Sequence, residues 1–114
     1  MELYLMRHAR AQHMARGIIN YKPQNVMNLT AQGRVQAGKA ALKLKHVALQ
    51  TIFVSELTRT QQTAVIVNKY HHVEIQQSAL INERKSGMEG KKHKEYLKRL
   101  KGKDIFHMKL PGGE

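Results

Sequence analysis

The sequence predicts an α/β fold with a mainly parallel sheet. Three short segments with the composition or alternation of strands, at residues 3–6, 51–55 and 73–77, are separated by two segments of helical character. This order is typical of parallel strands joined by crossover helices. The chain has 114 residues and no internal repeat, so we expect a single domain over residues 1–114.

The first predicted strand is the apolar run LYLM at residues 3–6. Residues 9–28 are expected to be irregular, because Gly17, Pro23 and three asparagines interrupt any regular pattern. An irregular segment of this length in a small domain is usually functional or partly disordered.

The first long helix is predicted within LTAQGRVQAGKAALKLK, with the Thr30 hydroxyl as its N-cap. Its inward face is predicted from three residues at helical spacing, which are Val35, Gly38 and Leu42. The second strand, TIFVS at residues 51–55, is rich in β-branched and aromatic residues.

The second half of the chain predicts two more helices and one more strand. ELTRTQQTAVIVNKYH follows the second strand as a helix, with inward-facing positions at Leu57, Thr60, Ala64 and Val67. VEIQQ at residues 73–77 alternates like a partly exposed third strand. KKHKEYLKRLKGK at residues 91–103 predicts an amphipathic helix with a solvated lysine face, and its apolar side carries Tyr96, Leu97 and Leu100. A turn is predicted at LPGGE.

The composition limits the partners and the compartment. Twenty Lys and Arg residues against eight Asp and Glu give a formal charge of +12, which attracts phosphorylated metabolites, nucleic acid or acidic membrane surfaces. The absence of cysteine excludes disulfides and thiolate metal sites. Because no signal-peptide pattern and no apolar stretch near ~20 residues is present, we expect a cytoplasmic protein without a membrane segment.

Basic and imidazole side chains follow the first two predicted strands. Arg7 and His8 come directly after the first strand, and Arg59 falls just past the second, in the first turn of the next helix. Ligands of parallel sheets bind beyond the carboxyl ends of the strands, so we expect these three side chains to converge. The start of the helix adds free N–H groups and a positive dipole end. The sequence therefore predicts a phosphate site at this edge.

Five ordered pieces of the sequence resemble the histidine phosphatase superfamily, whose best-known branch is the cofactor-dependent phosphoglycerate mutases. LYLMRHA resembles the family's opening strand with its Arg-His-Gly motif, and NLTAQGRVQA resembles a helix start of that family. VSELTRTQQTA resembles the family segment that supplies a second phosphate-binding arginine. INERKSGMEGK resembles the family's glutamate-containing loop with two glycines, and LPGGE resembles the opening of a later helix. The resemblance implies a three-layer αβα, phosphoglycerate mutase-like fold.

The resemblance also implies roles for four residues. His8 would be the nucleophile that forms a phosphohistidine, and Glu83 would protonate the leaving oxygen and then activate water. Arg7 and Arg59 would hold the phosphate oxygens. No metal and no organic cofactor is required, and the substrate would be a small phosphorylated metabolite, with hydrolysis favoured over mutase chemistry. Without the resemblance, Glu83 is more simply interpreted as a surface carboxylate next to an arginine.

Three residues near the nucleophile depart from the family pattern. Ala9 stands where the family has glycine, and a turn that needs positive φ there would strain it. Arg10 stands where many relatives carry Glu or Gln, and Met14 stands where mutase relatives often carry a phosphate-contacting Asn.

A second catalytic histidine is a further expectation of the family, in a His-Gly pair at the end of a late strand. This sequence contains no such pair. In the family that strand lies in the sheet between the strand ending at His8 and the one ending at Ser55. We therefore expect a truncated domain, incomplete at the C-terminus and weakly active or inactive, whose copies associate into a homo-oligomer that completes the sheet.

An alternative interpretation is a catalytically dead relative that binds anions or nucleic acid through its basic surface. The net charge, Ala9 and Arg10 all suit this alternative. A polyanion binder would lose affinity steeply with salt, whereas a phosphatase site would bind vanadate or phosphate competitively at one place.

Overall fold

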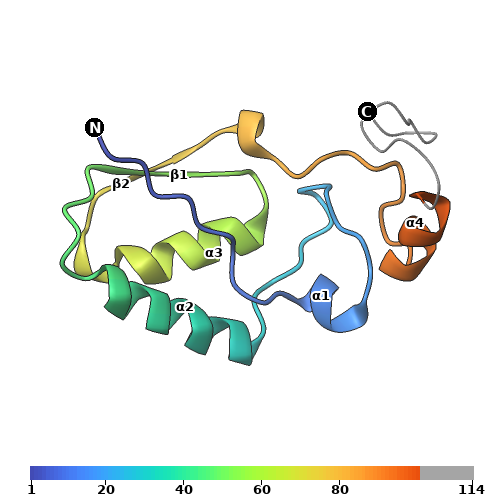
Figure 1. Cartoon of the computed structure of the whole chain (residues 1–114), viewed down its shortest axis with the longest axis horizontal. Coiled ribbons are helices and arrows are strands. Elements are labelled where there is room, and N and C mark those ends of the chain that lie inside the picture. The colour runs from blue at the N-terminus through green and yellow to red at the C-terminus, as the bar shows by residue number, and fades with distance from the viewer. Residues whose placement is uncertain (101–114) are drawn as a thin grey trace.

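The computed structural model describes residues 1–100, whose arrangement is shown in Figure 1. The elements are α1 (Gln12–Arg16), α2 (Ala31–Leu44), β1 (Thr51–Val54), α3 (Thr58–Val67), the 3₁₀ turn η1 (Asn68–Tyr70), β2 (Glu74–Gln77), the 3₁₀ turn η2 (Ala79–Ile81) and α4 (His93–Leu100). Their order confirms the predicted α/β class. The turn predicted at residues 110–114 and the predicted helical residues 101–103 lie outside the described part.

The two strands pair in parallel through the crossover helix α3. Thr51 lies opposite Glu74 and Val54 opposite Gln77, so the second and third predicted strands are confirmed. Helix α3 packs against β1 on one side and against α2 on the other, which places α3 between the sheet and α2 (Figure 1). No helix within residues 1–100 is long and apolar enough to cross a membrane.

The prediction of a strand at residues 3–6 is wrong for the described structure. These residues form no ladder, and none of their backbone groups bonds to another part of residues 1–100. Leu3 is 77% exposed and Leu5 is 89% exposed. A strand requires a neighbour to pair its N–H and C=O groups, and the sheet of the described residues contains β1 and β2 alone. An apolar pattern without that neighbour leaves an unpaired segment.

Helix α2 begins as predicted but turns a different face inward. The Thr30 hydroxyl accepts a hydrogen bond from Gly33 N at 3.0 Å and caps the helix. The buried residues are Gly33, Ala37 and Ala41, whereas the predicted face fails, since its two large members are exposed: Val35 and Leu42.

Close approach explains this choice of small residues on α2. A Cβ at position 33 would overlap the carbonyl oxygen of Arg10, so only glycine allows the chain to pass there. Thr30 N donates to the same carbonyl at 3.0 Å. Helix α2 therefore fixes the backbone directly after His8.

Helix α3 confirms most of its predicted inward face and adds two polar residues to it. Leu57, Ala64 and Val67 are buried as predicted, and Thr60 is half-buried. Arg59 and Thr63, one turn apart, are also buried, although no apolar pattern predicts them in the core. These two side chains connect α3 to the segment that carries His8.

The segment predicted to be irregular contains the short helix α1. An antiparallel bridge between Ala11 and Leu29 holds its start, and a second bridge joins Ile18 to Lys92. His93 N also donates to Gly17 O at 2.8 Å, which ties the start of α4 to the end of α1. In Figure 1, α1 and α4 accordingly lie at the end of the molecule away from β2.

We expect copies of the chain to associate through the unpaired apolar segment at residues 3–6. Replacing Leu3 and Leu5 together by Gln should weaken this association, because their burial in an interface drives it. Sedimentation velocity at several concentrations measures the effect. Leu80→Gln is the control, since Leu80 is 95% exposed in η2. A wild-type chain that sediments as a compact monomer at every concentration would contradict the prediction.

Candidate functional site

The backbone next to His8 is anchored on both sides by helices. Ala9 N donates to the Thr63 hydroxyl at 3.1 Å, and that hydroxyl donates to the Arg59 carbonyl at 2.8 Å. Ala9 is buried, and within residues 1–100 His72 is the sole non-glycine residue with positive φ. Alanine thus fits without strain at the position where the family carries glycine.

The hydrogen bonds of His8 define its protonation state. Its Nδ1 lies 2.7 Å from the Ala9 carbonyl oxygen, and Arg59 Nε donates to its Nε2 at 3.2 Å. A carbonyl can only accept and a guanidinium can only donate, so Nδ1 carries the proton and Nε2 the lone pair. Burial lowers the pKa of His8, and although the Ala9 carbonyl and Glu83 oppose it, the charges of Arg59 and Arg7 lower it further. The ring is therefore a neutral imidazole at pH 7 whose unprotonated nitrogen is Nε2.

Arg59 is a buried cation at the centre of the site. Its side chain is 1% exposed, and its Nη2 donates to the Asn20 carbonyl at 2.8 Å while Nη1 donates to Asn20 Oδ1. Burial lowers the pKa of Arg59, but a guanidinium stays charged in proteins. Glu83 Oε2 is 3.8 Å from Nη2, and this carboxylate is 55% exposed. Glu89 is a second carboxylate whose charge acts on Arg59, so the anion-binding capacity of this buried cation rests on the loose placement and half-exposure of Glu83.

The loop after η2 brings Glu83 to the cluster. Asn82 Oδ1 accepts from Glu56 N at 2.8 Å, and Asn82 Nδ2 donates to the Glu56 carboxylate at 2.7 Å. These two bonds fix the residue before Glu83 against the start of α3. Of the four predicted residues, His8, Arg59 and Glu83 are thus brought together.

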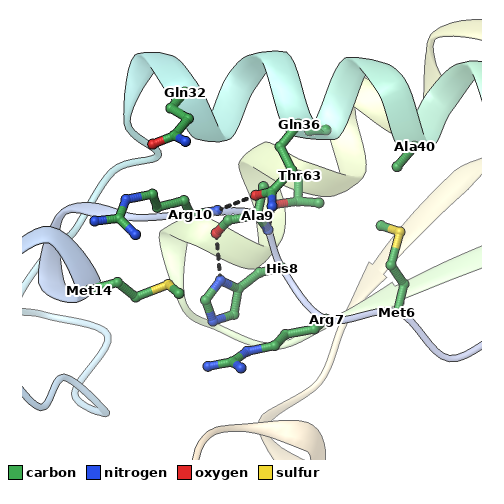
Figure 2. A pocket seen from close by; sticks show the side chains of 11 residues that line it. Met6, Arg7, His8, Ala9, Arg10, Met14, Gln32, Gln36, Ala40 and Thr63 are labelled. Atoms are coloured by element: carbon green, nitrogen blue, oxygen red, sulfur yellow. Dashed lines mark hydrogen bonds between the residues drawn. The ribbon is translucent and has the colours of Figure 1, made fainter.

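Arg7, the fourth predicted residue, lies next to this cluster but is exposed. Figure 2 shows its guanidinium beside the His8 ring. Its charge contributes to the lowered pKa of His8. Arg7 is therefore placed to reach an anion at His8 from the solvent side.

A hollow of about 420 Å³ opens between the His8 segment and α2. Figure 2 shows the side chains that line it, among them Arg7, His8, Arg10 and Gln36. Arg59 and Glu83 do not line the hollow, so of the four predicted site residues only Arg7 and His8 face it. Two of the lining residues are joined by a hydrogen bond, because Gln36 Oε1 accepts from Arg10 N at 2.9 Å.

Glu89 organises the turn that holds Arg59, and sequence reasoning missed it. Its carboxylate accepts from Tyr21 N at 2.6 Å, from Lys22 N at 2.9 Å and from Asn20 Nδ2 at 2.9 Å, and Asn25 Nδ2 adds a fourth donor at 3.2 Å. Burial raises the pKa of Glu89, but these donors outweigh it and the net pKa is lowered.

The signal for the Glu89–Asn20 pair was the group of asparagines in residues 9–28. Asparagine is common in loops because its side chain hydrogen-bonds to nearby backbone. Asn20 makes such a bond to the Asn25 carbonyl at 2.8 Å, but it is also 3% exposed and bonded to a residue 69 positions away. Only tertiary contacts could reveal that role.

The described residues contain no group of three or more His, Cys, Asp or Glu side chains that could hold a metal ion. The buried guanidinium of Arg59, with exposed Arg7 next to it, instead matches an anion.

A sequence profile of the histidine phosphatase superfamily (branch 1) matches residues 3–112 of the chain. The chain therefore belongs to the histidine phosphatase superfamily. A comparison with curated proteins gave no match.

Solved structures place the fold among phosphatases of this superfamily. A structure from Escherichia coli K-12 described as an alpha-ribazole-5′-P phosphatase has 25% identity and a TM-score of 0.78, covering 96% of this chain and 56% of its own. YhfR from Bacillus stearothermophilus has 27% identity and a TM-score of 0.72, with 82% and 46% covered. A mycobacterial glucosyl-3-phosphoglycerate phosphatase in complex with VO3 has 23% identity and a TM-score of 0.71, with 83% and 45% covered. The chain thus spans about half the length of these structures.

We expect Glu89→Gln to lower the free energy of unfolding at pH 7 by ~1–3 kcal/mol, because the amide NH₂ of the new side chain would face donors. Chemical denaturation measures the change. Glu74→Gln is the control, since Glu74 is exposed and accepts one bond, from Gln76 at 3.2 Å.

The effect should also depend on pH with a defined sign. Because folding lowers the pKa of Glu89 from its ordinary value of 4.5, the ionised carboxylate stabilises the folded state at pH values above about 4.5. This contribution is lost as the pH falls through the folded-state pKa. The difference between wild type and Glu89→Gln should therefore shrink below about pH 4.5. A difference that is absent at pH 7, or that grows with acid, would contradict the role of Glu89.

Proposed function

We propose that the chain is a phosphoglycerate mutase-like histidine phosphatase that transfers the phosphoryl group of a small phosphorylated metabolite to His8. The observation that carries the proposal is the neutral His8 ring, with Nδ1 on the Ala9 carbonyl and Nε2 facing the buried guanidinium of Arg59. A lone pair next to a buried cation is the arrangement that attack on a phosphate monoester requires.

The proposed reaction has two steps. In the first, His8 Nε2 forms a bond to phosphorus while the bond from phosphorus to the ester oxygen breaks, and protonated Glu83 gives its proton to that oxygen. In the second, water attacks the phosphohistidine, the N–P bond breaks, and the Glu83 carboxylate takes a proton from the water. Arg59 and Arg7 stabilise the charge on the transferring oxygens.

Glu83 is suited to reach the leaving group because it is half-exposed and adjacent to Arg59. Its distance of 3.8 Å from Arg59 Nη2 leaves the carboxyl beside the proposed phosphate position. The family membership supports a phosphorylated small molecule as substrate. The similar structure described as an alpha-ribazole-5′-P phosphatase supports hydrolysis over mutase chemistry.

Two features of the described structure favour low activity. Arg59 Nε–H occupies the lone pair of His8 Nε2, so a substrate must displace this bond before attack. The segment 3–6, which leads to His8, has no strand neighbour to hold it. We propose that pairing of this segment, in a homo-oligomer or with another polypeptide, raises activity.

The alternative function is a polyanion-binding module with no turnover. It is favoured by the exposure of Lys91, Lys92, Lys94, Lys98 and Arg99 in and before α4. Binding of a short single-stranded nucleic acid that weakens steeply with salt, and is lost when these residues are neutralised, would support it. Competition by vanadate at His8 would support the phosphatase instead.

We expect the chain to hydrolyse an aryl phosphate barely above background and to take a phosphoryl group from acetyl phosphate onto His8. Turnover of p-nitrophenyl phosphate measures the first, and mass spectrometry of His8 peptides measures the second. Glu83→Gln should reduce this turnover to background, because it removes general acid–base catalysis.

The matched control is His72→Ala, since His72 is exposed and follows η1, away from the site. His8→Ala should abolish both signals and His72→Ala neither. Phosphorylation that persists in His8→Ala would disprove the role of His8, whereas turnover on a par with other phosphatases of the superfamily would contradict the expected low activity.

A further inference from the structure

His13 places a second imidazole beside His8. The two ring centroids are 5.8 Å apart with an interplanar angle of 56°. Backbone bonds hold α1 in place, since Gln12 N donates to Asn28 O at 2.9 Å and Ile18 N donates to the His13 carbonyl at 3.0 Å. The position of His13 therefore follows from the backbone of α1 and does not depend on its own side-chain contacts.

The His13 ring makes no hydrogen bond to residues 1–100, and its Nδ1 is buried. Buried N–H groups without a partner are rarer than buried acceptors without one, so the ring is best satisfied with its proton on Nε2. In that tautomer the Nε2–H is a donor that no described residue uses. A ring that served only to pack against His8 would not need a nitrogen at all.

The titratable and charged groups that face His13 come from three parts of the chain. Arg59 lies on α3, Arg7 and His8 on the first segment, and Glu89 on the loop before α4. Burial, followed by Arg59, His8 and Arg7, lowers the pKa of His13 to about 4, while Glu89 acts in the opposite direction. The neutral His13 ring thus lies near the charges of Arg59 and Arg7, which favour an anion at this place.

We propose that His13 is a further phosphate contact, whose Nε2–H donates to an oxygen of the anion held between His8 and Arg59. This inference rests on the proposed function, since it assumes an anion at His8. It adds a residue from α1 to a site otherwise built from the first segment, α3 and the Glu83 loop. Bound anion also draws the His13 ring toward protonation, because an opposite charge nearby favours the charged form.

Binding of inorganic phosphate to the full chain tests the proposal. His13→Phe keeps a ring beside His8 but removes the donor, and we expect it to weaken phosphate binding ~10-fold, the loss of one hydrogen bond to a charged group. His13→Gln keeps a donor and should bind more tightly than His13→Phe. His71→Phe is the matched control, because His71 also has a buried ring nitrogen without a partner but follows η1, beyond the far end of α3.

NMR titration of the histidine rings gives a second readout. In the free chain His13 should titrate near pH 4, and saturation with phosphate should raise its pKa by ~1 unit or more. An unchanged His13 pKa, together with wild-type phosphate affinity in a folded His13→Phe chain, would overturn the inference.

Failure of the proposed function gives a different result. Arg7→Ala tests the anion site while leaving the His13 donor unchanged. Because Arg7 is exposed, it can be removed without opening the core. Phosphate binding that depends on Arg7 but not on His13 refutes the His13 contact and leaves the phosphatase assignment standing. If the wild-type chain binds no phosphate, both the assignment and the His13 contact fail.

Discussion

The burial of the Arg59 guanidinium is the constraint around which the site is built. A cation removed from water must be hydrogen-bonded or paired, otherwise its desolvation costs several kcal/mol. Arg59 meets this requirement with partners from three distant segments: the His8 ring, both oxygens of Asn20 and the Glu83 carboxylate. Glu89 accepts hydrogen bonds from Asn20 and Tyr21 and so holds the turn at Asn20. The buried charge of Arg59 therefore connects loops that are far apart in the sequence.

In the proposed function, the same contacts couple anion binding to the state of the His8 ring. While Arg59 Nε–H caps His8 Nε2, the lone pair of His8 is not available for attack. In the proposed reaction, a phosphate that accepts hydrogen bonds from Arg59 releases this lone pair and places phosphorus next to it. The bond from Nδ1 to the Ala9 carbonyl meanwhile keeps the ring in the reactive tautomer. Two hydrogen bonds keep the His8 ring oriented: Ala9 N donates to the Thr63 hydroxyl, and Thr30 N, at the start of α2, donates to the Arg10 carbonyl.

Local patterns predicted the elements that depend on local interactions. Thr30 caps α2 and Arg59 falls in the first turn of α3 because capping and helix starts are encoded by neighbouring residues. Residues 3–6 failed as a strand because pairing needs a neighbour that no local pattern supplies. The predicted inward face of α2 was Val35, Gly38 and Leu42, whereas the close approach of Arg10 selects Gly33. His13 and Glu89 escaped notice because their roles arise from contacts between segments far apart in sequence.

The central claim is that His8 is a neutral imidazole with its proton on Nδ1 and its Nε2 directed at an anion site. Nitrogen-15 NMR of the histidine rings at pH 7, with and without vanadate, tests this claim most directly. We expect a protonated Nδ1 and an unprotonated Nε2 in the free chain, with vanadate perturbing the Nε2 resonance of His8. A His8 ring that is protonated on both nitrogens at pH 7, or whose Nε2 resonance is indifferent to saturating vanadate, would contradict it.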